Sequence, residues 1–81
     1  MVDSHNYPTL ENNKTYNVLN LIAAKPCTKQ HISAYIQNCE CVLDVVNRKG
    51  FVEKDGNKYK ITEDGLDKID LIKITYGVYY G

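Results

Sequence analysis

The amino-acid sequence predicts an α+β fold in which three helices are followed by a two-stranded hairpin and one further helix. Three observations support this fold class. Apolar residues recur at helical spacing before position 50, Gly50 interrupts that pattern, and two strand-like runs then flank the turn sequence Asp55-Gly56-Asn57. The chain has 81 residues, 43% of them hydrophobic, which is enough for one domain with a modest core.

The first two helices are predicted from their apolar faces and boundary residues. We expect residues 1–10 to be a flexible arm, because they are polar and contain a proline. The domain begins with a helix over residues 11–25, whose apolar face carries Tyr16, Leu19, Ile22 and Ala23. Pro26 ends this helix because proline disfavours helical geometry in the preceding residue. Thr28 is a good N-cap for the second helix, which has Ile32, Tyr35 and Ile36 on its apolar face.

A third helix is expected from about Asn38 to Lys49, with Cys39, Val42, Leu43 and Val46 facing the core. Gly50 is expected at its C-terminus, where glycine readily takes the left-handed conformation. Strands are predicted at residues 51–54 and 58–61, because Asp-Gly between two such runs is a strong hairpin signal.

The last helix is predicted from residue 63 to about 74. Thr62 is its expected N-cap, and Glu63 and Asp64 occupy the first turn, where the helix dipole favours acidic residues. Gly65 is expected to let this helix pack closely on the domain. The helix carries two apolar stripes: the first consists of Leu66, Ile69 and either Ile72 or Lys73, and the second of Leu71, Ile74 and Val78.

Residues 63–81, the last helix and its tyrosine-rich tail, are therefore expected to form a homodimer. One stripe packs on the domain, and the other has no obvious partner within so short a chain, which is typical of an interface. The expected dimerisation residues are Leu71, Ile74, Val78, Tyr79 and Tyr80.

Charge and cysteine content indicate which partners and which cellular compartment to expect. The formal net charge is zero, but residues 45–61 have five basic and two acidic residues, whereas residues 62–81 have two basic and four acidic ones. We expect no membrane partner, because no segment approaches the roughly 20 apolar residues that span a bilayer, and the N-terminus lacks the pattern of a secretory signal. Three cysteines, an odd number, favour free thiols in a reducing cytoplasm over a disulfide scaffold.

No metal, cofactor or catalytic site is predicted. Cys27, His31, Cys39 and Cys41 have the atoms that zinc prefers. However, two residues apart on a helix are about 200° apart, so Cys39 and Cys41 point away from each other. The sequence has no glycine-rich phosphate loop and no nucleophile with a recognisable base nearby, so we expect no enzymatic activity. Tyr16, Tyr35 and Tyr59 are expected to complete the core with their hydroxyls at its edge.

Three blocks of sequence together resemble a known family. The segment from Leu19 to Ile32 is similar to its opening helix and the start of the second. Residues 43–52, Leu-Asp-Val-Val-Asn-Arg-Lys-Gly-Phe-Val, resemble the end of its recognition helix, and residues 59–65, Tyr-Lys-Ile-Thr-Glu-Asp-Gly, resemble its strand-to-helix junction. In this order they resemble winged helix-turn-helix DNA-binding domains of prokaryotic and phage regulators, with a three-helix core, a two-stranded wing and a C-terminal helix.

The resemblance implies a sequence-specific transcriptional regulator that binds double-stranded DNA. Helix 38–49 would read bases in the major groove and the wing, 51–61, would contact the backbone. The positions that would face bases are Asn38, Glu40, Cys41, Asp44 and Asn47. The expected phosphate contacts are Lys29, Gln30, Gln37, Arg48, Lys49, Lys54, Lys58 and Lys60.

An alternative function follows from the acidic residues on the third helix. Two carboxylates facing a polyanion are unfavourable, and the first two turns of that helix contain no arginine or lysine. The alternative is a winged helix that binds a partner protein through its acidic recognition face or its tyrosine-rich tail, without DNA.

Overall fold

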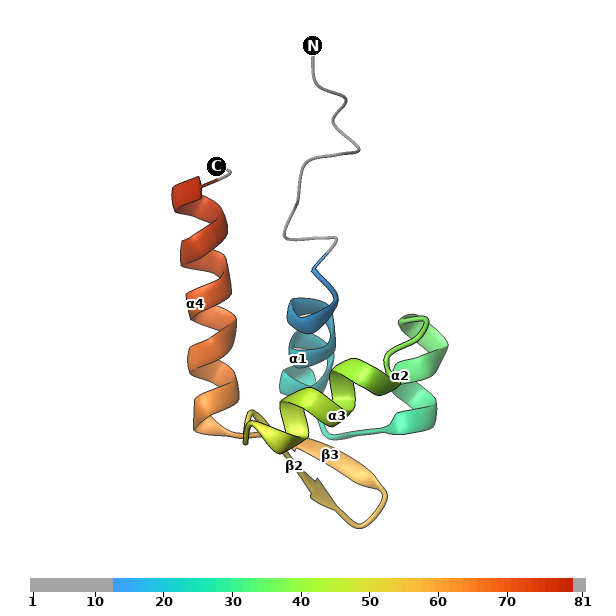
Figure 1. Cartoon of the computed structure of the whole chain (residues 1–81). Helices are drawn as coiled ribbons and strands as arrows, with labels where there is room; N and C mark the ends of the chain where they lie inside the picture. Colours follow the sequence, from blue (N-terminus) through green and yellow to red (C-terminus); the bar gives the residue numbers. More distant parts are fainter. Residues whose placement is uncertain (1–12, 80–81) are drawn as a thin grey trace.

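A computed structural model describes residues 13–79, with side chains through Tyr76 (Figure 1). The expected arm at residues 1–10, and the start of the first helix at residues 11 and 12, lie outside the described residues. The elements in chain order are α1 (Lys14–Ala24), β1 (Cys27–Thr28), α2 (Lys29–Tyr35), α3 (Glu40–Arg48), β2 (Val52–Asp55), β3 (Lys58–Ile61) and α4 (Glu63–Tyr79). The α+β prediction is confirmed within these residues: four helices pack with one small antiparallel sheet.

The sheet has three strands in the order β1-β3-β2, one more than the sequence analysis predicts. The additional strand is β1, which pairs antiparallel with β3 through Cys27 opposite Tyr59 and Thr28 opposite Lys58. The prediction of a two-stranded hairpin alone is therefore incomplete. Because β1 leads directly into α2, this pairing joins the start of α2 to the hairpin.

The starts of the first two helices follow from side-chain caps. Asn13 Oδ1 accepts a hydrogen bond from the backbone N–H of Tyr16 at 2.9 Å, so the structure begins α1 at Lys14. The helix ends at Ala24, next to Lys25 and Pro26. Thr28 caps α2 as expected, since its Oγ1 accepts from the N–H of His31 at 3.1 Å.

The ends of α3 are set by two residues with positive φ. Asn38, at φ 56°, occupies the left-handed region, so α3 begins at Glu40, later than expected. At the other end Gly50 has φ 81°, its N–H donates to the carbonyl of Asn47, and the N–H of Phe51 donates to the carbonyl of Val46. These two bonds form a Schellman motif, which confirms the C-terminal glycine.

The hairpin turn is shorter than expected. Asp55 belongs to β2 and lies opposite Lys58, so only Gly56 and Asn57 connect the strands. Gly56 has φ 63°, whereas Asn57 is not among the described residues with positive φ. Glycine at the first of two turn positions is the pattern of a type II′ turn, whose twist matches that of the strands.

The core lies between α1, α3 and the inner face of the sheet, with α4 against its side. The side chains that are less than 2% exposed are Leu19, Ile22, Ile32, Val18, Val46, Val52 and Cys39, and Leu43 is 2% exposed. Two predictions about the core are wrong. Tyr35 is 70% exposed because α2 ends there and Ile36 is already extended, and Leu66 is 47% exposed while Ile69 and Ile72 of its stripe are buried.

The last helix starts at a tightly packed junction and ends later than expected. Thr62 Oγ1 accepts from the N–H of Gly65 at 3.1 Å, which confirms the N-cap. A Cβ on Gly65 would lie 2.0 Å from the carbonyl oxygen of Phe51, so the expected close packing is confirmed. The helix then runs along α1 to Tyr79, and Asn13 Nδ2 donates to the hydroxyl of Tyr76 at 3.1 Å (Figure 1). Among the described helices, none has the length and apolar character that crossing a membrane requires.

Candidate nucleic-acid interface

α3 has one buried and one exposed face. Cys39, Leu43 and Val46 are no more than 2% exposed and pack into the core. The opposite face carries Glu40, Cys41, Asp44 and Asn47, all exposed. This polarity arises from apolar residues spaced three and four apart in a helix that Gly50 ends, so the sequence itself determines which side chains face outward.

All thirteen residues expected at a DNA interface are exposed. They are Lys29, Gln30, Gln37, Asn38, Glu40, Cys41, Asp44, Asn47, Arg48, Lys49, Lys54, Lys58 and Lys60. The structure places them on four neighbouring elements: the start of α2, the α2–α3 connection, the outer face of α3 and the hairpin. Exposure is necessary for contact with DNA, but it does not distinguish DNA from a protein partner.

The acidic outer face of α3 is partly balanced within the helix. Arg48 donates through Nη2 to Asp44 Oδ2 in an ion pair between residues four apart. Both side chains are about 70% exposed, at 72% and 67%. An exposed pair of this kind contributes little to stability, but it brings a guanidinium over the carboxylate that would otherwise face a ligand alone.

The outer face of the hairpin alternates acidic and basic side chains. Glu53 lies opposite Lys60, and Asp55 lies opposite Lys58. The ammonium of Lys60 is 3.0 Å from Asp55 Oδ2, and this hydrogen bond and charge raise the pKa of Lys60. The sequence predicts the excess of lysine here but not its pairing, because the cross-strand register decides which charges meet.

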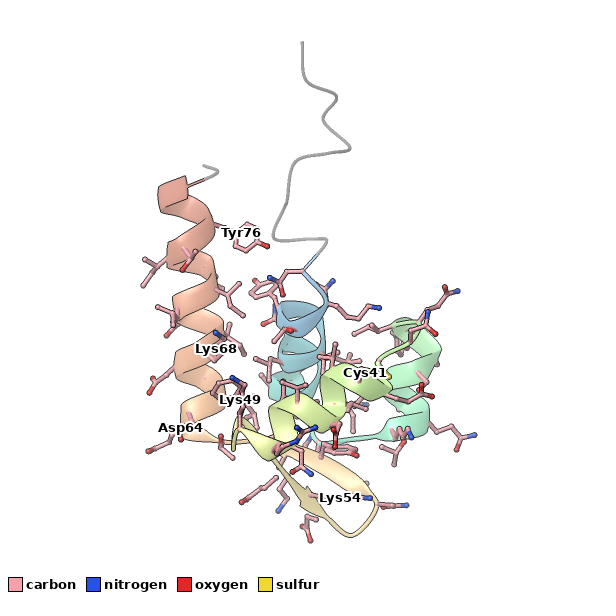
Figure 2. The ribbon with its side chains drawn as sticks, in the orientation of Figure 1. Cys41, Lys49, Lys54, Asp64, Lys68 and Tyr76 are labelled. Carbon is pink, nitrogen blue, oxygen red and sulfur yellow. The ribbon has the colours of Figure 1, made fainter. Side chains whose placement is uncertain are left out.

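Three cations near α3 and the hairpin remain available for a ligand. Lys49 and Lys58 form no ion pair within the described residues. Lys54 lies on the other face of the hairpin, with its ammonium 5.8 Å from the centroid of the Tyr59 ring. Figure 2 shows Lys49 at the end of α3 and Lys54 on the hairpin beside it.

The cysteines do not form a metal site in the described part of the chain, where no group of three or more His, Cys, Asp or Glu residues is arranged to hold an ion. Cys27 is buried and its thiol donates to the carbonyl of Lys25 at 3.1 Å. Cys39 is buried next to the hydroxyl of Ser33, with 3.3 Å between Sγ and Oγ, and Cys41 is exposed. His31 instead packs on Tyr35, with 5.1 Å between the ring centroids.

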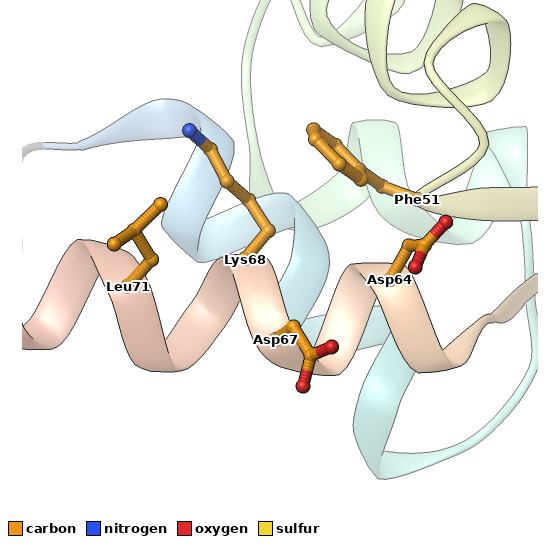
Figure 3. Close-up of a pocket in the computed structure, with 5 residues that line it drawn as sticks. All are labelled: Phe51, Asp64, Asp67, Lys68 and Leu71. Carbon is orange, nitrogen blue, oxygen red and sulfur yellow. The ribbon is translucent and has the colours of Figure 1, made fainter.

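Two shallow pockets flank the helices. One, of about 300 Å³, is lined by Phe51 and by Asp64, Asp67, Lys68 and Leu71 of α4 (Figure 3). The ammonium of Lys68 lies 5.8 Å from the centre of the Phe51 ring. The other, of about 410 Å³, is lined by Asn17, Asn20, Leu21, Ala24, Tyr35 and Ile36.

One further feature of the surface was not predicted from the sequence. Val45, on α3, is 42% exposed and places an apolar side chain next to Asp44 on the surface. Exact helical spacing would have identified this position.

Of the expected dimerisation residues, Leu71 and Ile74 are 54% and 62% exposed. The side chains of Val78, Tyr79 and Tyr80 lie outside the described residues.

Comparison of the chain with protein-family models, with curated proteins and with solved structures found no match.

Proposed function

We propose that the chain is a winged helix-turn-helix protein that binds double-stranded DNA, with α3 in the major groove and the β2–β3 hairpin as a wing on the backbone. The observation that carries this proposal is the two-sided character of α3. One face is fully buried, and the opposite face is open next to a hairpin that carries three lysines. A helix presented in this way can enter a groove without disturbing the core.

Base reading would fall to the polar side chains on the outer face of α3. An asparagine can bond both N6 and N7 of adenine, and a carboxylate can accept from N4 of cytosine. Asn47 would make the contact with adenine, and Glu40 the contact with cytosine. Val45 adds an apolar surface of the kind that contacts the methyl group of thymine.

Phosphate contacts would come from exposed cations that have no ion-pair partner among residues 13–79. Lys29 precedes the face at the start of α2, Lys49 follows it at the end of α3, and Lys58 lies on the wing. With Lys54 these make four contacts, so the logarithm of affinity is expected to fall with that of salt at a slope of about −3.6 per protomer. This modest slope agrees with a chain whose net charge is zero.

A titration of fluorescently labelled genomic DNA fragments at increasing salt tests the proposal. Lys58→Gln should weaken binding several-fold at low salt and reduce the slope by about 0.9. Lys14→Gln is the matched control, because Lys14 is an exposed lysine at the N-terminal end of α1, away from the hairpin (Figure 1). Absence of binding at about 50 mM salt would overturn the proposal.

A partner protein is the second candidate, and the exposed carboxylates favour it. Glu40 is the first residue of α3 and Asp44 lies at its middle, and only Asp44 has an ion-pair partner among the described residues. A basic surface on another protein would match this face. The same titration separates the two functions, because DNA binding that weakens steeply with salt supports the first and its absence at low salt supports the second.

A further inference from the structure

The outward face of α4 is apolar in its C-terminal half and has no partner in the described structure. Gly65, Ile69 and Ile72 are buried against the domain, and Tyr76 is half-buried on the same side. Leu71 and Ile74 lie on a stripe about 150° around the helix from that side. They are 54% and 62% exposed, although each carries a four-carbon apolar side chain.

This stripe is presented by a helix that is fixed at both ends of its contact with the domain. At the base, Gly65 touches the carbonyl of Phe51, and near the top the hydroxyl of Tyr76 accepts from Asn13. α4 forms one edge of the described structure, with nothing on the side away from α1 (Figure 1). Leu71 and Ile74 are therefore held in place on a surface that a second molecule can reach.

Spacing along the stripe is that of a helix that pairs with another helix. Asp64, Asp67, Leu71 and Ile74 follow at intervals of three, four and three, the a/d pattern of a heptad. The first two members are unpaired carboxylates within the described residues, and the last two are apolar. Pairing is therefore confined to the C-terminal half of the helix.

We infer that this face binds a second copy of the chain, with the two α4 helices antiparallel and Leu71 of each copy against Ile74 of the other. A parallel pair would bring Asp64 and Asp67 against their own copies, which is unfavourable. The antiparallel pair places these carboxylates at opposite ends. It also brings Asp70 of one copy and Lys73 of the other to the same edge, about two residues apart along the axis, or about 3 Å.

The pocket at Phe51 adjoins the same interface. Leu71 and Asp67 belong both to the lining of the pocket and to the stripe (Figure 3). In the antiparallel register the C-terminal end of each helix runs toward this pocket on the other copy. The pairing is independent of the proposed DNA binding, so either can fail without the other.

The mass of the full chain in solution tests the pairing. Light scattering should give about 18 kDa, twice the 9.2 kDa of one chain. Leu71→Asp and Ile74→Asp should each return it to the monomer mass, because the substituted side chain would be buried in the interface. Leu66→Asp is the control, since Leu66 is an exposed leucine of the same helix that lies off the stripe. A monomer at all concentrations, or a dimer that both stripe variants leave unchanged, would overturn the inference.

The direction of pairing is tested with mixed single-cysteine variants in a Cys41→Ser background, where the two remaining native thiols are buried. Oxidation of a mixture of Leu71→Cys and Ile74→Cys chains should give the mixed disulfide in at least tenfold excess over either homodimer. Homodimers in excess would overturn the antiparallel arrangement. Asp70→Lys and Lys73→Asp should each raise the dimer dissociation constant several-fold, and the double variant should restore it; failure to restore also counts against this register.

Discussion

Two regions that meet at Gly50 differ in how completely their polar groups are hydrogen-bonded within the protein. In the junction between β2 and α4, the carbonyl of Phe51 accepts from the N–H of Thr62 at 3.1 Å and from its hydroxyl at 2.9 Å. The same oxygen lies against Gly65, with no room for a side chain. On the outer face of α3 and the hairpin, by contrast, the charged side chains are exposed, and their ion pairs within the described residues are with one another.

The junction therefore determines the fold, whereas the outer face is free to determine a ligand. Substitutions at the junction act on packed backbone, where small changes in volume have large effects. Substitutions on the outer face change charge with little effect on stability. The stretch from Gly50 to Leu66 is therefore strong evidence for the architecture, while the ligand depends on side chains around it.

Gly65→Ala should have the largest effect, because it introduces an atom 2.0 Å from the carbonyl oxygen of Phe51 and 2.6 Å from Cδ1 of Ile61. Alanine normally favours a helix over glycine by up to about 1 kcal/mol, so propensity alone would stabilise the protein. The steric conflict makes the substitution destabilising instead. We expect a loss of about 3 kcal/mol in unfolding free energy, measured by urea denaturation.

Gly56→Ala is the matched control for that experiment. Nothing lies within 4 Å of a Cβ at Gly56, so only its positive φ opposes a side chain, at a cost of about 1 kcal/mol. Equal losses at the two glycines would contradict the claim that the junction is sterically closed.

Thr62→Ala should have the next largest effect. The hydroxyl of Thr62 accepts from the N–H of Gly65 and lies 2.6 Å from the carbonyl of Gly50, so one side chain joins the start of α4 to the end of α3. Loss of an N-cap together with this second bond is expected to lower the unfolding free energy by about 2 kcal/mol. Thr62→Ser retains the hydroxyl and should recover most of the lost unfolding free energy. A serine variant that is as unstable as the alanine variant would assign the effect to the methyl group instead.

The sequence predicts the junction well because each of its features depends on a specific local chemistry. Gly50 takes a conformation that other residues disfavour, Thr62 has a cap-forming oxygen, and Gly65 lacks a Cβ. The apolar face of α3 is predicted for the same reason, since one helical period decides it. All of these are readable within a few residues along the chain.

Features that depend on distant contacts could not be predicted in this way. β1 has two residues, too few for a periodic pattern, and it is a strand only because β3 pairs with it. Tyr35 has the spacing of a core residue, yet no element within residues 13–79 covers it, and it is 70% exposed. The charge pairing on the hairpin depends on a register that a one-residue change in turn length would alter.

Asp44→Asn tests the outer face, where we expect little change in folding and a measurable change in binding. The ion pair with Arg48 is exposed, so the unfolding free energy should change by less than about 0.5 kcal/mol. Removal of the carboxylate frees the guanidinium and takes a negative charge from the face, so affinity for non-specific DNA should rise by about threefold to fivefold. A large loss of stability would show that this face is structural.

Lys60→Gln should have the smallest effect and gives the finest distinction between the two regions. Asp55 raises the pKa of Lys60, so the pair is fully charged near neutral pH and is lost only as pH rises through the raised value. Because Lys60 is engaged by Asp55 while Lys58 has no ion pair among the described residues, Lys60→Gln should reduce the salt slope of DNA binding by less than Lys58→Gln does. Parallel salt titrations of both variants measure this difference. Equal reductions would mean that a bound phosphate displaces Asp55, so that the charge pairing on the hairpin has no influence on binding.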